Sequence, residues 1–221
     1  MGFYIGVNRM LSAFEKLTFE KQKSILNAAA GVFAEEGYHY ASISRICEKA
    51  GISNGALYKY FKNKEMLYLS VIDCVAARVE GELYIKYMEN VESIFEGVRN
   101  LLEGMLDFGK ENRDHLSIYS DLGSGAMNRF AAYASGKFKN ATSSYTVKLV
   151  EMGKRNNEIS KKIRSEIAAC LIDNYITLFS YALVSEYHTE RFDSFFVSEA
   201  KNIYFEDRIE IIIESLKAAF E

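Results

Sequence analysis

Residues 42–65 read Ser-Ile-Ser-Arg-Ile-Cys-Glu-Lys-Ala-Gly-Ile-Ser-Asn-Gly-Ala-Leu-Tyr-Lys-Tyr-Phe-Lys-Asn-Lys-Glu, and this stretch predicts two short helices joined at a glycine. Ser42 suits a helix N-cap. Apolar side chains then recur at i, i+3, i+4 and i+7, at Ile43, Ile46, Cys47 and Ala50. Gly51 follows, where the left-handed conformation that ends a helix favours a residue without a β-carbon. The first short helix is therefore expected to end at Gly51.

The second short helix begins after Ser53, another N-cap residue, and its outward side chains are small, polar or cationic. The residues that face outward or flank the inward face are Asn54, Gly55, Tyr58, Lys59 and Tyr60. Small residues let the backbone approach base edges, and phenolic hydroxyls and ammonium groups suit phosphate oxygens. This layout is that of a DNA-reading helix-turn-helix, although the spacing alone also fits a plain corner between two helices.

Asn63 can cap a third helix, and Lys64 then lies in its first turn. A cation is unfavourable there because the N-terminus of a helix carries partial positive charge. A nearby phosphate would remove this conflict, so Lys64 is a candidate phosphate contact.

The wider segment from Glu20 to Asp73 carries a longer pattern. It consists of Ile25 to Phe33, Gly37-Tyr38, Ala41-Ser42, Ala50 to Ser53, Gly55, Leu57-Tyr58, Tyr60-Phe61 and Lys64-Glu65. This pattern resembles the N-terminal domain of the TetR family of bacterial repressors. The resemblance implies that DNA is contacted by Ser42, Ser44, Arg45, Ser53, Asn54, Gly55, Tyr58 and Tyr60, and that Lys64 holds a phosphate. Lys59 occupies a position that varies in the family and is a candidate for setting site preference.

The charge distribution agrees with a DNA-binding N-terminal part. Residues 1–70 carry nine Lys and Arg against six Asp and Glu, whereas residues 71–221 carry eighteen against twenty-four. The positive part coincides with the helix-turn-helix, and the acidic remainder disfavours wrapping by nucleic acid. We expect a local reader of DNA and not a coating protein.

Composition and motifs argue against a membrane protein, a secreted protein, an enzyme and a metal-binding protein. The 221 residues are 49% hydrophobic and 26% charged, typical of a globular chain, and contain no run of about 18 uncharged apolar residues that would predict a membrane span. The first six residues are too short for a secretory signal, so a cytoplasmic location is expected, and Met10 is as reasonable a start as Met1. No nucleophile–base motif or glycine-rich phosphate loop predicts an enzyme. The three cysteines and three histidines show no ligand spacing, so neither a metal nor a cofactor is expected.

The pattern of apolar residues predicts an all-α fold of about nine helices and no strand. Besides the two short helices, they span 19–36, 64–88, 91–110, 112–121, 126–154, 160–188 and 207–220, with an irregular stretch at 189–204. We expect an N-terminal arm and DNA-binding domain over 1–65 and a helical ligand-binding and dimerisation domain over 66–221.

Two helices near the C-terminus carry more apolar surface than one packing face requires. Along these two helices, a candidate dimer interface is formed by Ile167, Leu171, Leu178, Ile209, Ile212, Ile213, Leu216 and Phe220. A four-helix interface across a two-fold axis would use one face of each helix, as the family resemblance also implies. The alternative is that both faces are buried inside one monomer.

The middle of the chain is rich in aromatic residues and methionine, and the resemblance implies a ligand pocket there. Candidate pocket residues are Met105, Phe108, Tyr119, Met127, Phe130, Tyr133, Phe138, Tyr145, Tyr175 and Phe179, with Asn174 as a polar group. They suit an apolar or aromatic small molecule, although such residues more often form ordinary core. We therefore predict a homodimeric repressor that a small-molecule inducer releases from a pseudo-palindromic operator in double-stranded DNA. The alternative is a DNA-binding architectural or cell-cycle factor that uses a protein partner.

Overall fold

The computed structural model describes residues 12–87, 90–195 and 204–221, without the side chains of residues 140–144. The starting arm, Met1 to Arg9, lies outside these ranges. Every regular element in the described part is a helix, which confirms the all-α class. The elements are α1 (Ser12–Glu15), α2 (Phe19–Tyr40), α3 (Ile43–Ala50), α4 (Asn54–Tyr60), α5 (Lys64–Arg78), η1 (Val79–Ile85), α6 (Ile94–Glu111), α7 (Arg113–Asp121), η2 (Gly125–Phe130), α8 (Ala131–Arg155), α9 (Ser165–Ala182), α10 (Glu186–Asp193) and α11 (Phe205–Phe220).

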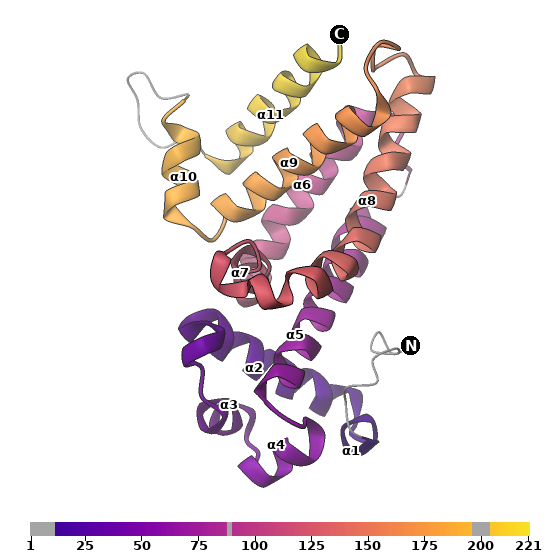
Figure 1. Cartoon of the computed structure of the whole chain (residues 1–221). Coiled ribbons are helices and arrows are strands. Elements are labelled where there is room, and N and C mark those ends of the chain that lie inside the picture. Colours follow the sequence, from indigo (N-terminus) through magenta and orange to yellow (C-terminus); the bar gives the residue numbers. More distant parts are fainter. Residues whose placement is uncertain (1–11, 88–89, 196–203) are drawn as a thin grey trace.

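The molecule has two parts that α5 connects (Figure 1). Helices α1 to α4 gather around the first half of α5 and form the part that we call the head. The remaining helices pack along the second half of α5 and along one another and form the body, with α9 lying between α8 and α11 in the view of Figure 1. The expected domain boundary at 65/66 therefore falls in the first turn of a continuous helix.

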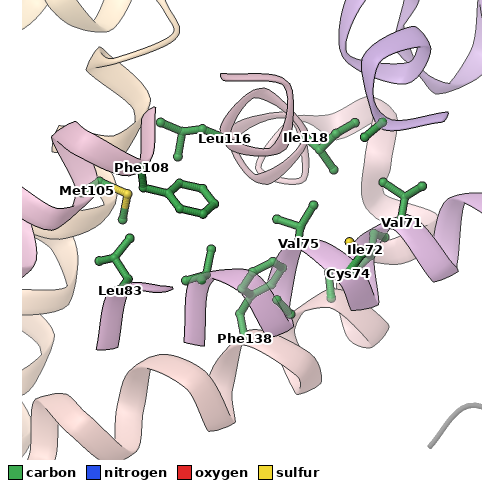
Figure 2. Packing of buried hydrophobic residues seen from close by; sticks show 14 of the residues in the cluster. Val71, Ile72, Cys74, Val75, Leu83, Met105, Phe108, Leu116, Ile118 and Phe138 are labelled. Carbon is green, nitrogen blue, oxygen red and sulfur yellow. The ribbon is translucent and has the colours of Figure 1, made fainter. Parts of the chain in front are cut away.

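Buried apolar side chains form the core of the body around α5 (Figure 2). Those labelled in the figure come from α5, η1, α6, α7 and α8, and they are Val71, Ile72, Cys74, Val75, Leu83, Met105, Phe108, Leu116, Ile118 and Phe138. Burying such side chains contributes roughly 1.5–3 kcal/mol each. The connecting helix is therefore held by packing on several sides and not only by its own hydrogen bonds.

One predicted helix boundary is confirmed and others are wrong. Gly37 adopts the non-helical angles φ 72° and ψ 160°, so α2 is kinked at the predicted end of its first part, and Tyr38 after the kink is buried in the core. The helix expected over 64–88 changes to a π-helix at Val79. The helix expected over 160–188 starts at Ser165 and breaks after Ala182, where the Thr189 hydroxyl donates to the Ala182 carbonyl oxygen at 2.7 Å. Residues 186–193, part of them expected to be irregular, form α10.

Head and body meet at an aromatic cluster. The ring of Phe130, at the end of η2, lies 4.8 Å from the ring of Tyr38 and 4.9 Å from that of Tyr68. Beside it Arg129 forms an ion pair with Glu65, and its guanidinium lies 5.7 Å from the centre of the Tyr38 ring. The segment between α7 and α8 therefore touches both the end of α2 and the start of α5.

Candidate nucleic-acid interface

The helix-turn-helix is built by hydrogen bonds between near neighbours in sequence. The Ser42 hydroxyl oxygen accepts from the Arg45 backbone N–H at 3.1 Å, and the Ser53 hydroxyl oxygen accepts from that of Ala56 at 3.1 Å. Gly51 adopts φ 63° and ψ 42°, and its N–H donates back to the end of α3. Ile46, Cys47, Ala50, Leu57 and Phe61 are buried beneath the two helices. These contacts leave the opposite faces of α3 and α4 open to solvent.

The residues predicted to contact DNA lie together on this open surface, at the foot of the head in Figure 1. Exposed members are Ser42, Ser44, Arg45, Ser53, Asn54, Gly55, Tyr58 and Lys59. Tyr60 and Lys64 are half-buried. The Tyr60 ring packs edge-on against Phe14 of α1 at 5.8 Å, so part of this side chain supports the head itself.

Arg45 is not an unpaired cation. Its guanidinium donates to Glu35 at 2.8 Å and also to Glu36, both at the end of α2. These hydrogen bonds raise the pKa of Arg45 above its usual range. Sequence reasoning missed the two carboxylates because they lie nine and ten residues before Arg45, beyond the spacing of one helix. A phosphate would have to compete with them for this guanidinium.

Lys64 also has partners within the head. Its ammonium donates to the carbonyl oxygens of His39 at 3.0 Å and Ala41 at 3.1 Å, and it lies 4.9 Å from the centre of the Tyr38 ring. Carbonyl groups at a helix C-terminus carry partial negative charge and favour a cation. The unfavourable position of Lys64 at the start of α5 is therefore compensated by the end of α2. Two of its three N–H groups are used by these carbonyl oxygens, so one donor remains for a phosphate.

Asn54 and Ser44 connect the two helices of the motif. The Asn54 side-chain NH₂ group donates to the Ser44 hydroxyl oxygen at 3.2 Å. Asn54 is the first residue of α4 and Ser44 the second of α3, and both are exposed. The two residue types were predicted at this surface, but their contact is a product of the way the two helices pack.

The body contains a groove of about 440 Å³ between α7, α8 and α9. Its lining residues are Tyr119, Ser135, Phe138, Lys139, Thr146, Val147, Ala169, Cys170 and Asp173. The lining combines aromatic rings, with Tyr119 and Phe138 4.8 Å apart, and polar groups. Burial raises the pKa of Tyr119 to about 12 and raises that of Asp173 above its usual range.

Two of the predicted pocket residues, Tyr119 and Phe138, line this groove. Most of the others are placed in the packing of the protein: Met105, Phe108, Met127, Phe130 and Phe179 are buried, and the Tyr145 ring stacks on that of Tyr84 at 5.1 Å. Tyr133 donates to Asp73, Tyr175 is half-buried, and Asn174 is exposed and donates to the Cys170 sulfur at 3.5 Å. Aromatic residues occur both in protein cores and in ligand pockets, so the sequence alone could not distinguish pocket residues from core residues.

The residues predicted at the dimer interface divide between the two helices. On α9, Ile167 is 48% and Leu178 52% exposed, and Leu171 is half-buried. On α11, Ile209, Ile212, Ile213, Leu216 and Phe220 are all at most 2% exposed, because α11 packs against α6 and α9. The Phe220 ring, for example, lies 6.4 Å from that of Phe95. These five side chains have no surface left for a partner, so the structure corrects their placement to the protomer core.

The described residues also show how the chain stands as a metal-binding or a membrane-spanning protein. No three His, Cys, Asp or Glu side chains gather there as a set of metal ligands. No single helix in the same ranges is long and apolar enough to cross a membrane; α9 and α10 pass that test only together, and they bend by 120° between them.

Two capped helices joined by a left-handed glycine, with an exposed polar face above a buried apolar one, define a helix-turn-helix protein of the DNA-binding class. Residues 25–71 match the family described as bacterial regulatory proteins, tetR family. The N-terminal part of the chain therefore carries a DNA-binding domain of this family, and the match covers residues 25–71 of the 221.

Known relatives agree with this placement. The chain is 45% identical over 51 residues to the fatty acid metabolism regulator protein of Bacillus subtilis, which is 23% of this chain and 26% of the relative. It is 32% identical over 102 residues to the HTH-type transcriptional regulator YdgC of the same organism, 45% of this chain and 52% of the relative. The matches thus span at most about half of these two relatives.

Among solved structures, the transcriptional regulator FadR from Bacillus subtilis in complex with stearoyl-CoA superposes with a TM-score of 0.67. It is 17% identical, and the superposition covers 90% of this chain and 99% of that one. At this identity the likeness shows a shared fold.

Proposed function

We propose that the protein is a homodimeric transcriptional regulator that binds a pseudo-palindromic operator and is released from it by a small molecule. The observation that supports this proposal most directly is the exposed face of α3 and α4, where Ser44, Asn54, Tyr58 and Lys59 stand on a capped helix-turn-helix. Phosphate contacts hold such a motif on DNA, and contacts to base edges select the sequence.

A second copy of the chain is proposed to cover the exposed apolar face of α9. Ile167, Leu171 and Leu178 lie four and seven residues apart, so they share one side of the helix. Large apolar side chains left exposed along one helix are typical of an interface. Two heads then reach half-sites about 34–36 Å apart, one turn of DNA.

The groove between α7, α8 and α9 is the proposed inducer site. Its volume and its mainly apolar lining with a few polar groups suit a small apolar or aromatic ligand. The related FadR, whose structure holds stearoyl-CoA, makes an acyl thioester one compound class to test. No cofactor is required by the proposal.

A route from this groove to the head is supported by the chain path. Tyr119 of α7 and Ser135 of α8 both line the groove, and η2 lies between them in sequence. Phe130 of η2 packs on Tyr38, over which the Lys64 ammonium also lies. A ligand that separates α7 from α8 would shift η2 and with it the contact between Phe130 and Tyr38 of the head. A difference in ligand affinity between the two states of about 1–3 kcal/mol changes DNA affinity roughly 5- to 150-fold.

The experiment that tests the proposal is selection of bound sequences from a random duplex pool with purified protein at two salt concentrations. We expect a two-fold symmetric consensus and an affinity that falls with salt. No consensus together with steep salt dependence would contradict operator binding and favour the architectural alternative. A thermal-shift series with apolar, cationic and acyl compounds tests the inducer, because a ligand of the folded state raises its stability.

The phosphate contact proposed for Lys64 has its own test on the selected operator. We expect Lys64→Ala to weaken binding to all sequences alike and to reduce the slope of log affinity against log salt by about 0.9 for each phosphate lost. Lys62→Ala, which removes an exposed cation two residues earlier, is the matched control. An unchanged slope for Lys64→Ala would show that its ammonium serves only the carbonyls of His39 and Ala41.

A further inference from the structure

We infer that Asn54 reads an adenine in each half-site, with Ser44 as the residue that positions its amide. The inference rests on the proposed function and adds to it the base and the pair of residues that select it. It depends on a side-chain contact between two helices, at 3.2 Å between the Asn54 nitrogen and the Ser44 hydroxyl oxygen.

The first step concerns which groups of the amide stay available. The NH₂ group of asparagine has two N–H donors and the carbonyl oxygen accepts. One N–H is bonded to Ser44, so one donor and the carbonyl oxygen remain. In our proposal the Ser44 bond uses the N–H that points away from the carbonyl oxygen, which leaves the other N–H beside that oxygen in the plane of the amide. In the major groove, adenine presents an N7 acceptor beside an N6 amino donor, and asparagine pairs with both. Guanine offers two acceptors at the same edge and cannot satisfy the Asn54 carbonyl oxygen.

The second step concerns orientation. Asn54 is exposed, so without a partner its amide would rotate and lose side-chain entropy on binding. The bond to Ser44 holds the amide before DNA arrives. The neighbouring Gly55 leaves space on this surface, because a β-carbon added there would meet only the Ser53 hydroxyl, at 4.0 Å. A base edge can therefore come close to this part of α4.

The third step concerns the neighbouring cation, which carboxylates of the head itself engage. Arg45, one residue after Ser44, is the side chain that would select guanine with its two parallel N–H groups. Its guanidinium is engaged by Glu35 and Glu36 instead. Tyr58, four residues after Asn54, shares its side of α4 and is 52% exposed, which suits a phosphate contact beside the base contact.

The test is selection from the random duplex pool with wild type, Asn54→Ala, Ser44→Ala and Ser44→Thr. We expect the wild-type consensus to contain an adenine at one position of each half-site, and Asn54→Ala to lose the preference at that position alone. Affinity for the adenine site should fall about 5- to 150-fold per half-site. Ser44→Ala should weaken the same preference, and Ser44→Thr should restore it because it keeps the hydroxyl.

A chemical probe separates base reading from a general loss of binding. Replacing the selected adenine by 7-deazaadenine removes the N7 acceptor. It should weaken wild type and leave Asn54→Ala unaffected. Asn128→Ala, which removes an exposed amide outside the head, is the matched control and should keep the wild-type consensus.

The outcomes distinguish this inference from the function on which it rests. A consensus that survives Asn54→Ala unchanged, or equal sensitivity of wild type and Asn54→Ala to 7-deazaadenine, would overturn the reading role of Asn54. A Ser44→Ala variant with the full wild-type preference would overturn the positioning role of Ser44. If wild type selects no sequence at all, the proposed operator binding itself fails.

Discussion

The head and the body hold their helices by different means. In the head, each of the helices α2 to α5 starts with a side-chain cap, from Thr18, Ser42, Ser53 and Asn63 in turn. In the body, α6 is capped by Ser93 and the Asp207 carboxylate accepts from the Tyr204 N–H at the start of α11, but α7, α8, α9 and α10 start without any side-chain cap bond. Local bonds that span three residues are thus the rule in the head, whereas four successive helices of the body depend on packing between helices far apart in sequence.

This difference matches the tasks that we propose for the two parts. A surface that reads base edges needs side chains held to within a fraction of an ångström, and short local bonds supply that. A groove that takes a ligand and shifts needs helices that can slide against one another, and packed helices without fixed ends permit such movement. Four predictions, from the largest expected effect to the smallest, test how far this contrast holds.

The largest effect on stability is expected at Phe130, where head and body pack against one another. Phe130→Ala should lower the free energy of unfolding by about 3–5 kcal/mol, because a ring that is 2% exposed would leave a cavity between Tyr38 and Tyr68. Urea unfolding measures this change in the free energy of unfolding. Phe195→Ala, at a ring that is 74% exposed, is the control and should change that free energy by no more than about 0.5 kcal/mol. A cost below about 1 kcal/mol for Phe130→Ala would mean that the two parts are stable independently.

Acid is expected to act on the body through His115. Burial, and then the neighbouring Arg78 guanidinium, lower the pKa of His115 to about 4. In the unfolded chain the His115 imidazole is protonated near pH 6.5, whereas in the folded protein it is protonated only near pH 4. The free energy of unfolding therefore falls as the pH drops from about 6.5 to about 4. The loss should reach about 3 kcal/mol, from 1.36 kcal/mol per pKa unit.

The variant His115→Gln isolates this effect. The difference in unfolding free energy between wild type and His115→Gln should change between pH 7 and pH 4, since all other titrating groups are shared. A constant difference across that range would contradict the assigned role of His115.

Two glycines should respond with opposite signs. Gly51→Ala should destabilise the protein by about 1–2 kcal/mol, because φ 63° is left-handed and a β-carbon is unfavourable there. Gly136→Ala, within α8 and with open space around the added β-carbon, should stabilise by about 0.5–1 kcal/mol. Thermal unfolding measures both, and two changes of the same sign would remove the contrast between turn and helix.

The smallest effect concerns the caps themselves. Ser53→Ala should cost about 1 kcal/mol because it removes the acceptor for the Ala56 N–H. Ser124→Ala, at the start of η2 where no side-chain cap bond is made, should stay within about 0.5 kcal/mol. Equal costs at the two serines would show that capping is no special property of the head.

The sequence by itself determined the all-α class, the course of the helix-turn-helix and the surface that carries the predicted DNA contacts. Caps at Ser42 and Ser53 and the turn at Gly51 act over three or four residues, so the residue types alone predict them. The same holds for the exposure of Asn54 and Tyr58, which follows from the period of a short helix.

Tertiary structure decided what those side chains touch. The partners of Arg45, Lys64 and Asn54, the groove between α7, α8 and α9, and the burial of the apolar stripe of α11 all join separate helices. Helical periodicity states which side of a helix is apolar, but it does not state what covers that side. That is why the sequence assigned Ile212 and Leu216 to a second subunit, whereas α6 and α9 bury them within one chain.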